Sequence, residues 1–252
     1  MMAIVLITGA TAGFGEACAK KFAENGYNLI ITGRRQERLS QLQQELEKQY
    51  EIKVLPLSFD VRDEQAVSSI LGGIPEEWKA VDILINNAGL ALGLSTIDES
   101  ALSDWDTMLD TNVKGLLYVS RVVMPWLKAR SKGHIINLGS TAAKAVYAKG
   151  AVYCASKAAV DSISQGMRID LLPYHIKVTA IHPGAAETEF SMVRFKGDSS
   201  QADNVYKGIK ALSAEDVADT IYYCASLPAH VCINDLVITC TQQANAYYTY
   251  RE

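Results

Sequence analysis

The sequence predicts a single α/β domain with a doubly wound, mainly parallel sheet of about seven strands flanked by helices. Short apolar runs rich in β-branched residues alternate along the chain with longer segments of helical periodicity. Strands that alternate with helices form parallel crossovers, which place helices on both faces of one sheet. No internal repeat, low-complexity tract or linker interrupts this alternation, so residues 1–252 are expected to form one domain.

The first half of the chain supplies four of the expected strands. Residues 3–8 (AIVLIT) are apolar without interruption, as expected of a strand that is covered on both faces. Helical periodicity follows over residues 13–26 and stops at Gly26, a residue type that commonly ends helices. The same alternation then predicts strands at 27–32, 52–59 and 81–86, and helices at 35–50 and 63–74.

The second half continues the pattern. A long helix is expected over 104–129, with Ser103 or Asp104 as its N-cap. Residues 187–210 are polar and contain glycine without a clear strand or core helix, so we expect a substrate lid within about this segment. Further strands are expected at 133–139, at 176–183 and, more weakly, at 233–240, with a helix through Tyr153 and Lys157.

Composition narrows the class of protein. Hydrophobic residues make up 49% of the chain and charged residues 21%, a globular balance. The net charge of −4 and the pI of about 5.6 exclude a general basic surface for nucleic acid. The N-terminal apolar run is too short to span a membrane and lacks the basic flank and cleavage site of a secretory signal. We therefore expect no membrane partner and a cytoplasmic location.

The cysteines and histidines offer no metal site. Five cysteines form no C-x-x-C pair, which indicates reduced thiols in a reducing compartment: Cys18, Cys154, Cys224, Cys232 and Cys240. None of the four histidines stands at a catalytic or metal-ligand spacing from an acid or a cysteine. His182 lies closest to the expected cofactor and is expected to pack or to form a hydrogen bond.

A glycine-rich turn follows the first expected strand with the spacing G-x-x-x-G-x-G. Glycines let the backbone approach a pyrophosphate, which the N-terminus of the next helix stabilises. The spacing differs from G-x-G-x-x-G, and no G-K-[ST] follows, so the turn is not a P-loop. The alternative is a glycine turn without a ligand. The residues expected to contact the cofactor here are Gly9, Ala10, Thr11, Ala12, Gly13, Phe14 and Gly15.

Arg34 and Arg35 stand at the end of the second expected strand, where the choice of nucleotide is made. A carboxylate there would bind the ribose 2′-hydroxyl of NAD, whereas arginine accommodates the 2′-phosphate of NADP. Because no acid stands at this point, NADP(H) is the expected cofactor. The alternative is two solvated arginines at the start of a charged helix.

The ends of the next two strands are also expected to line the nucleotide. Asp60 and Val61 close the third strand and would frame the adenine. Small residues and amides after the fourth strand would form the floor of the site, at Asn87, Ala88 and Gly89.

Tyr153 and Lys157 form the most informative pair, because positions i and i+4 share one face of a helix. An ammonium beside a phenol favours the phenolate, which brings a group with an ordinary pKa of about 10 closer to neutral pH. Ser140, thirteen positions upstream of the tyrosine, would hold a substrate oxygen while the tyrosine exchanges a proton. An amphipathic helix with a solvated lysine would explain the pair alone equally well.

Asn112 is a poor helix former inside the long apolar helix. Its side chain either bonds back within the helix or opens the helix locally to hold a water. The sequence leaves both possibilities open.

Taken in order, these motifs resemble the classical short-chain dehydrogenase/reductase family over nearly the whole chain, through T-G-A-T-A-G-F-G, N-N-A-G and P-G-A-A-E-T. The resemblance implies a nicotinamide-binding Rossmann fold with Tyr153 as the acid/base and Ser140 positioning the substrate oxygen. It implies that Lys157 lowers the tyrosine pKa and bonds the nicotinamide ribose, and that Asn112 holds a water in a proton relay. Orientation of the nicotinamide carboxamide is implied for Pro183, Gly184 and Thr188. Phe14 departs from the aliphatic residue more usual in the family.

At finer grain the chain is similar to NADP-dependent 3-hydroxy acid dehydrogenases, in stretches such as G-R-R-Q-E-R-L and T-E-F-S-M-V-R-F-K-G-D. This similarity implies reversible hydride transfer between NADP and small 3-hydroxy acids, such as L-allo-threonine, serine, 3-hydroxyisobutyrate and 3-hydroxypropionate. It also implies a cytoplasmic homotetramer.

Recognition of such a substrate requires a cation or amide donors for its carboxylate. Arg194 or Lys196 is expected to supply the cation, unless both are solvated, pair with Asp198 or contact another subunit. Two alternatives to the whole interpretation are a carbonyl reductase of the same fold acting on another substrate class, and a non-catalytic NADP-binding sensor.

Overall fold

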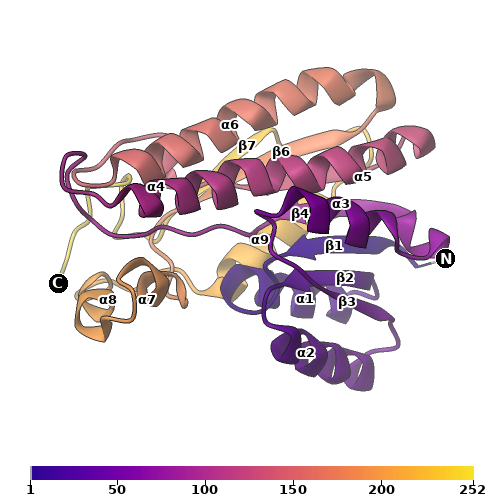
Figure 1. Cartoon of the computed structure of the whole chain (residues 1–252), viewed down its shortest axis with the longest axis horizontal. Helices are drawn as coiled ribbons and strands as arrows, with labels where there is room; N and C mark the ends of the chain where they lie inside the picture. The colour runs from indigo at the N-terminus through magenta and orange to yellow at the C-terminus, as the bar shows by residue number, and fades with distance from the viewer. Residues whose placement is uncertain (1) are drawn as a thin grey trace.

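Across residues 2–252, which the computed structural model describes, seven strands form one all-parallel sheet in the order β3-β2-β1-β4-β5-β6-β7 (Figure 1). The predicted doubly wound parallel sheet is therefore confirmed. The strands are β1 (Ile4–Thr8), β2 (Asn28–Gly33), β3 (Val54–Ser58), β4 (Val81–Asn86), β5 (His134–Leu138), β6 (Lys177–Pro183) and β7 (Asp235–Ile238).

Helices cover both faces of the sheet (Figure 1). Helices α1 (Gly13–Glu24), α2 (Gln36–Gln49) and α9 (Ala214–Ser226) lie on one face. The opposite face carries α3 (Glu64–Gly72), α5 (Leu116–Arg130) and α6 (Ala151–Leu171). Three shorter helices complete the fold: α4 (Leu102–Leu109), α7 (Phe190–Arg194) and α8 (Ser199–Asn204). In this part of the chain, no helix combines the length and the apolar character that crossing a bilayer requires.

The continuous apolar runs of the strands are explained by the two hydrophobic layers. Successive side chains of a strand point to opposite faces of its sheet. Val5 and Ile7 accordingly pack with α1, α2 and α9, whereas Ile4 and Leu6 pack with α3, α5 and α6. Because both faces are covered by helices, every position of β1 is buried and apolar until Thr8.

The switch in strand order creates the site. The chain runs from β1 outward through β2 to β3, and then returns to the other side of β1 to form β4. The connections after β1 and β4 therefore leave in opposite directions, and a crevice opens beyond the carboxyl ends of these strands.

The long predicted helix is broken in the structure. α4 ends at Leu109, a π-helical turn spans Asp110–Gly115, and α5 begins at Leu116. The predicted N-cap at Ser103 or Asp104 is wrong, because the helix begins at Leu102 after Ala101, which offers no capping side chain. The break is at Asn112, the one position where the sequence suggested a local opening.

The segment after β6 folds back over the carboxyl edge as α7 and α8, and the C-terminus returns to it. The backbone N–H of Glu252 donates to the carbonyl of Gly208, and that of Tyr250 donates to the carbonyl of Gln242. The aromatic tail is thus bound to its own chain, although Tyr247, Tyr248 and Tyr250 expose their rings.

A buried polar network joins the sheet to α5 and α6. Asn86 and Asn137 are paired across β4 and β5, and the Asn86 amide donates to Asn137 (2.9 Å) and to Ser120 of α5 (3.0 Å). Asn137 in turn donates to Ser164 of α6 (2.9 Å). Since buried polar groups are costly when they lose their partners, this network fixes how both helices dock on the sheet.

Replacing Asn137 with leucine should lower the free energy of unfolding by about 1–3 kcal/mol, because it removes one of the two acceptors of the buried Asn86 amide and leaves one N–H unpaired. Urea denaturation followed by circular dichroism measures the change. The exposed Asn204 is the matched control, and its replacement with leucine should cost less than about 0.5 kcal/mol. Equal effects at the two positions would contradict the assignment.

Candidate active site

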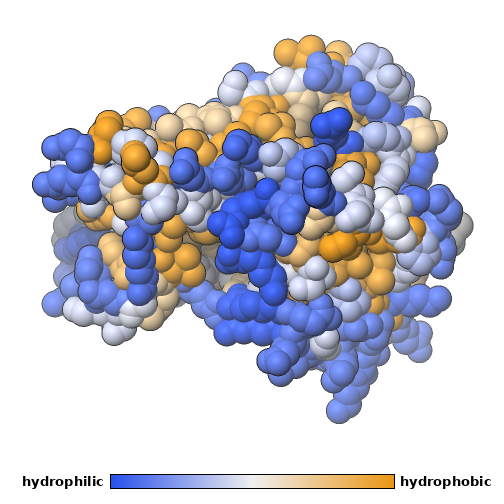
Figure 2. Space-filling view, viewed as in Figure 1, coloured by the Kyte–Doolittle hydropathy of each residue, from blue (hydrophilic) through white to orange (hydrophobic). Residues whose placement is uncertain are grey.

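A cleft of about 560 Å³ opens at the carboxyl edge of the sheet. The space-filling view shows the surface hollowed between the α7–α8 segment and the body of the molecule (Figure 2). Most residues that the sequence predicted for the site line this cleft: Gly9, Thr11, Ala12, Gly13, Phe14, Arg34, Arg35, Asp60, Val61, Asn87, Ala88, Gly89, Ser140, Tyr153, Lys157, Pro183, Gly184, Thr188 and Arg194. Three do not line it and lie behind its wall: Ala10, Gly15 and Asn112.

The turn after β1 depends on its glycines. Gly9 and Gly13 have φ of +68° and +54°, a region that favours glycine. A Cβ on Gly15 would lie 2.3 Å from the carbonyl oxygen of Gly9, so only a bare backbone fits there. The first turn of α1 has no side-chain cap, which leaves its N–H groups directed at the cleft. This arrangement fits a dinucleotide pyrophosphate.

The ends of β1 and β4 are tied together by side chains. The Asn87 amide donates to the carbonyls of Thr8 (2.8 Å) and Gly9 (3.1 Å). The hydroxyl of Thr8 accepts the backbone N–H groups of Asn87 and Ala88, both at 3.0 Å. Asn87 therefore supports the glycine turn as well as lining the cleft.

The arginines at the end of β2 differ in their contacts. Arg35 donates to the hydroxyl of Thr11 (2.8 Å) and to the carboxylate of Glu189 (2.9 Å). Arg34 is 62% exposed, and its nearest carboxylate, Asp60, is 3.9 Å away. Asp60 itself is bound by Arg62. Arg34 thus has the freer guanidinium, and Arg35 is anchored beside the glycine turn.

Glu189, which the sequence analysis missed, is shared by two arginines. Its carboxylate lies 2.9 Å from Arg35 and 2.7 Å from Arg38, and these guanidinium groups, Arg38 first, hold its pKa below the usual range. Glu189 immediately precedes α7, so the ion pair joins the segment predicted to be a lid to the end of β2. Only its place after Thr188 could have suggested this role.

Tyr153 and Lys157 lie one turn apart on α6, and both side chains are buried. Burial raises the pKa of Tyr153, with Tyr147 adding to the shift, while Ser140 and Arg194 act in the opposite direction. Burial lowers the pKa of Lys157 to about 8. The Lys157 ammonium donates to the carbonyl of Leu138 (2.8 Å), so its predicted effect on the phenol stays a prediction.

Ser140 reaches the same part of the cleft from the end of β5. It caps the short 3₁₀ turn Thr141–Ala143, and its Oγ accepts the N–H of Ala142 at 3.1 Å. The hydroxyl can still donate a hydrogen bond, and it faces the cleft beside Tyr153. The cap holds the side chain in one orientation.

Asn112 uses its amide to reach outside its own helix. Its Oδ1 accepts the N–H of Leu90 (2.8 Å), and its Nδ2 donates to the carbonyl of Leu90 (2.8 Å) and to the hydroxyl of Ser156 (3.0 Å). The first possibility, a bond back within the helix, is therefore wrong. A Cβ on Gly89 would lie 3.1 Å from Asn112 Oδ1 and 3.3 Å from Lys157 Nζ, so the three residues converge. The water relay stays a prediction.

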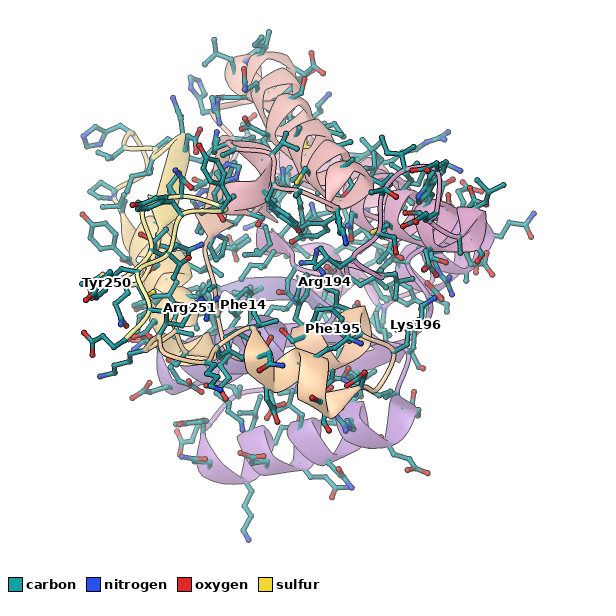
Figure 3. The ribbon with its side chains drawn as sticks, turned by 90° about the vertical axis from the view of Figure 1, so that its left-hand side faces the viewer. Phe14, Arg194, Phe195, Lys196, Tyr250 and Arg251 are labelled. Atoms are coloured by element: carbon teal, nitrogen blue, oxygen red, sulfur yellow. The ribbon has the colours of Figure 1, made fainter. Side chains whose placement is uncertain are left out.

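Arg194 and Lys196, the two candidate cations for the substrate carboxylate, lie in different surroundings. The Arg194 guanidinium lies 5.3 Å from the ring centroid of Tyr147 and 5.8 Å from that of Tyr153. Its Nε donates to the carbonyl of Gly93 (3.2 Å), and its Nη2 is buried without a hydrogen-bond partner in residues 2–252. Lys196 is instead bound to Asp104 at 2.9 Å. In Figure 3, Arg194 extends toward the centre of the molecule and Lys196 lies toward its outer edge.

Further lining residues carried no signal in the sequence. Tyr147 has a buried hydroxyl without a partner in the described chain, and Phe190 packs at 5.7 Å from the Tyr153 ring. Gln243 accepts the N–H of Ala185 (2.7 Å), and a Cβ on Gly184 would lie 2.1 Å from its Oε1. The C-terminal segment therefore supports the turn after β6, a contact between distant parts of the chain that no local pattern predicts.

Comparison with known proteins gives consistent matches. A family model described as short chain dehydrogenase matches residues 3–199. NADP-dependent 3-hydroxy acid dehydrogenase YdfG of Escherichia coli (strain K12) is 48% identical over 244 residues, which cover 96% of this chain and 97% of the relative. Sulfoacetaldehyde reductase 2 of Chromohalobacter salexigens is 47% identical over 245 residues, covering 97% and 96%. The closed form of serine dehydrogenase complexed with NADP⁺ superimposes with a TM-score of 0.92 at 46% identity, covering 99% of each chain.

Replacing Lys157 with methionine should stabilise the fold at pH 7. The folded protein holds this lysine with a pKa of about 8, below the value of about 10.4 expected when unfolded, so charging it opposes folding. The penalty is present below pH 8 and disappears as the pH rises toward 10.4. We expect a gain of about 1–3 kcal/mol at pH 7 that shrinks by pH 10, together with loss of turnover.

Urea denaturation at the two pH values measures this difference. The exposed Lys48, replaced in the same way, is the control and should leave the pH dependence of stability unchanged. A variant at Lys157 that is less stable than the parent at both pH values would contradict the burial penalty.

Proposed function

The chain belongs to the short-chain dehydrogenase family, and from this premise we propose that it is an NADP-dependent oxidoreductase acting reversibly on small 3-hydroxy acids. The single observation that carries the substrate class is the buried, partner-free Nη2 of Arg194 beside Tyr153. A buried guanidinium nitrogen that lacks an acceptor is a ready partner for a small anion bound next to the phenol.

The cofactor in this proposal is NADP(H), which supplies a nicotinamide carbon that accepts or donates hydride. The chain would hold it along the cleft, with the glycine turn at the pyrophosphate and Arg34 and Arg35 at the 2′-phosphate. Asp60 and Val61 would lie at the adenine, and Asn87 to Gly89 would form the floor. Tyr153 and Lys157 would contact the nicotinamide ribose, and the carboxamide would be held by Pro183, Gly184 and Thr188.

The chain's own chemistry is proton exchange at the reacting oxygen. Tyr153 accepts the hydroxyl proton in the oxidative direction and returns it in the reductive direction. Ser140 donates to that oxygen and holds it beside the phenol. Lys157 brings positive charge to the same end of α6, and Asn112 links the loop after β4 to that helix.

The names of the relatives support a substrate whose anionic group lies at a fixed distance from the reacting carbon. Two of them are named for 3-hydroxy acids or serine, which carry a carboxylate, and a third for sulfoacetaldehyde, which carries a sulfonate. Both are anions on a short aliphatic chain. Arg194 suits either group, because its planar fork donates to two oxygens at once.

The segment 187–210 is proposed as the substrate lid of a single domain that comprises residues 1–252. Its contacts support that role: the Gly93 N–H donates to the carbonyl of Arg194 (2.8 Å), and Glu189 binds Arg35 and Arg38. These contacts hold the segment against the cleft, where it would exclude water from the reacting groups once substrate binds. A homotetramer and a cytoplasmic location are proposed by analogy with the family.

A panel of small hydroxy acids and oxo acids, assayed with NADP and NAD in parallel, tests the function directly. We expect turnover of at least one 3-hydroxy acid with a preference for NADP. Preference for NAD would overturn the role given to Arg34 and Arg35, and turnover limited to uncharged carbonyls would favour a reductase of another substrate class.

Replacing Tyr153 with phenylalanine should lower kcat by about 10²–10⁴-fold, because it removes the oxygen that exchanges the proton. Binding of NADPH, measured by fluorescence titration, should be nearly unchanged. A variant that retained most of its turnover would show that another group exchanges the proton.

Replacing Arg194 with alanine should lower kcat/KM for a 3-hydroxy acid by about 10- to 100-fold, chiefly through KM, because a charge-assisted hydrogen bond is lost. An uncharged alcohol with the same reacting centre should lose much less. Lys196→Ala is the matched control and should affect neither substrate, because Lys196 is bound to Asp104. Equal losses of Arg194→Ala on both substrates would rule out the clamp.

A further inference from the structure

We infer that His182 is a positioning residue, which holds the backbone of Ser140 in place through a cluster formed with Asp161, Asp235 and Lys144. This inference rests on the proposed role of Ser140. The sequence showed no acid at a catalytic spacing from this histidine, and the fold brings two of them to it from distant segments.

The imidazole of His182 fills the space beside the end of β5. Its side chain is fully buried, and its Nδ1 lies 3.3 Å from the backbone nitrogen of Ser140 and 3.2 Å from its carbonyl oxygen. A Cβ on Gly139 would lie 2.3 Å from this Nδ1. Glycine at position 139 therefore makes room for the ring, and the ring contacts the backbone of the next residue.

The other side of the ring faces two carboxylates. Nε2 lies 3.2 Å from Asp235 Oδ1 and 3.6 Å from Asp161 Oδ1. Burial holds the pKa of His182 below its usual value, with Lys144 acting in the same direction and Asp235 and Asp161 in the opposite one. A neutral ring that carries its proton on Nε2, toward the carboxylates, has a free lone pair on Nδ1 that accepts the Ser140 N–H.

Lys144 completes the cluster and provides its cation. The ammonium binds Asp161 at 2.9 Å and also binds Asp235. Three of these side chains could in principle ligate a metal ion, since the ligand atoms of Asp161, His182 and Asp235 lie within 4.8 Å of one another. Lys144 lies between the two carboxylates and offsets one of their two negative charges.

The cluster connects the serine segment to the tyrosine helix. Asp161 follows Tyr153 and Lys157 at intervals of four residues, so all three lie along one face of α6. The segment from Ser140 to Lys144 is fixed at both ends, by His182 at its start and by the two carboxylates at its end. The distance between the serine hydroxyl and the tyrosine phenol thus depends on this cluster.

Three substitutions at His182 test the roles of the two ring nitrogens separately. Asparagine places an amide oxygen near the position of Nδ1, glutamine places its amide near Nε2, and leucine removes both. His182→Leu and His182→Gln should lower kcat for a 3-hydroxy acid by about 10- to 100-fold, since small misplacements of a catalytic group have effects of this size. His182→Asn should restore kcat to within about threefold of the parent, because the Ser140 N–H regains an acceptor.

Two further measurements separate positioning from general loss of structure. Hydrogen exchange of the peptide that covers residues 139–144, followed by mass spectrometry, should be faster in the Leu and Gln variants than in the parent and the Asn variant. This readout does not require turnover, so it remains valid if the proposed substrate class fails. The affinity for NADPH should be the same in all four proteins.

His134 provides the matched control. It is a second buried histidine on the same sheet, bound to Thr179 at 2.7 Å at the opposite end of β5. His134→Leu should lower the midpoint of urea denaturation without changing kcat. Equal kcat and equal exchange in the Asn, Gln and Leu variants of His182, or an unchanged kcat in His182→Leu, would overturn the inference.

Discussion

The close approach of the turn after β1 to the end of β4 is the constraint on which the rest of the site depends. Asn87 donates to the carbonyls of Thr8 and Gly9, and the Thr8 hydroxyl accepts two N–H groups in return. A side chain on Gly15 would collide with both partners of this contact, at 2.3 Å from Gly9 O and 2.5 Å from Asn87 Nδ2. The contact fixes the switch point of the sheet, and with it the direction in which α1 leaves. Every group that lines the cleft is positioned relative to these strand ends.

A second level of organisation is built on α6. One face of this helix carries Tyr153, Lys157 and Asp161 in turn, so one helix serves the proposed reacting oxygen, the proposed ribose end of the cleft and the cluster beside Ser140. Burial disfavours the charged forms of both Tyr153 and Lys157. The hydrophobic layer beneath these groups offsets the free-energy cost of burying them, and residues such as Val160 and Leu171 are fully enclosed there. Burying Tyr153 and Lys157 in the site therefore lowers the stability of the fold at the same helix.

The sequence predicted the sheet, the glycine turn and the tyrosine–lysine pair well, because each follows from a local pattern: apolar runs, glycine spacing or a four-residue interval. Contacts between segments that are distant in the sequence could not be predicted in this way. Glu189 binds Arg35 across 154 positions, and Asp235 meets His182 only because β6 and β7 are neighbours in the sheet. Charge and place in the segment after Thr188 do not distinguish Lys196 from Arg194, yet Lys196 binds Asp104 and has a left-handed backbone. Local propensity also favoured one uninterrupted helix through Asn112, whose side chain instead bonds to the loop that carries Leu90.

The π-helical turn at Asp110–Gly115 has a consequence for how this protein tolerates changes in length. A π turn holds one residue more than an α turn, and each residue rotates a helix by about 100°. The extra residue lets Met108 of α4 pack with Leu90 and Tyr153 at the substrate end, while Val119 and Leu127 of α5 face the sheet. Deleting any single residue within the turn would restore a regular helix and rotate one of these faces out of register. The number of residues in this stretch is therefore a structural requirement in its own right.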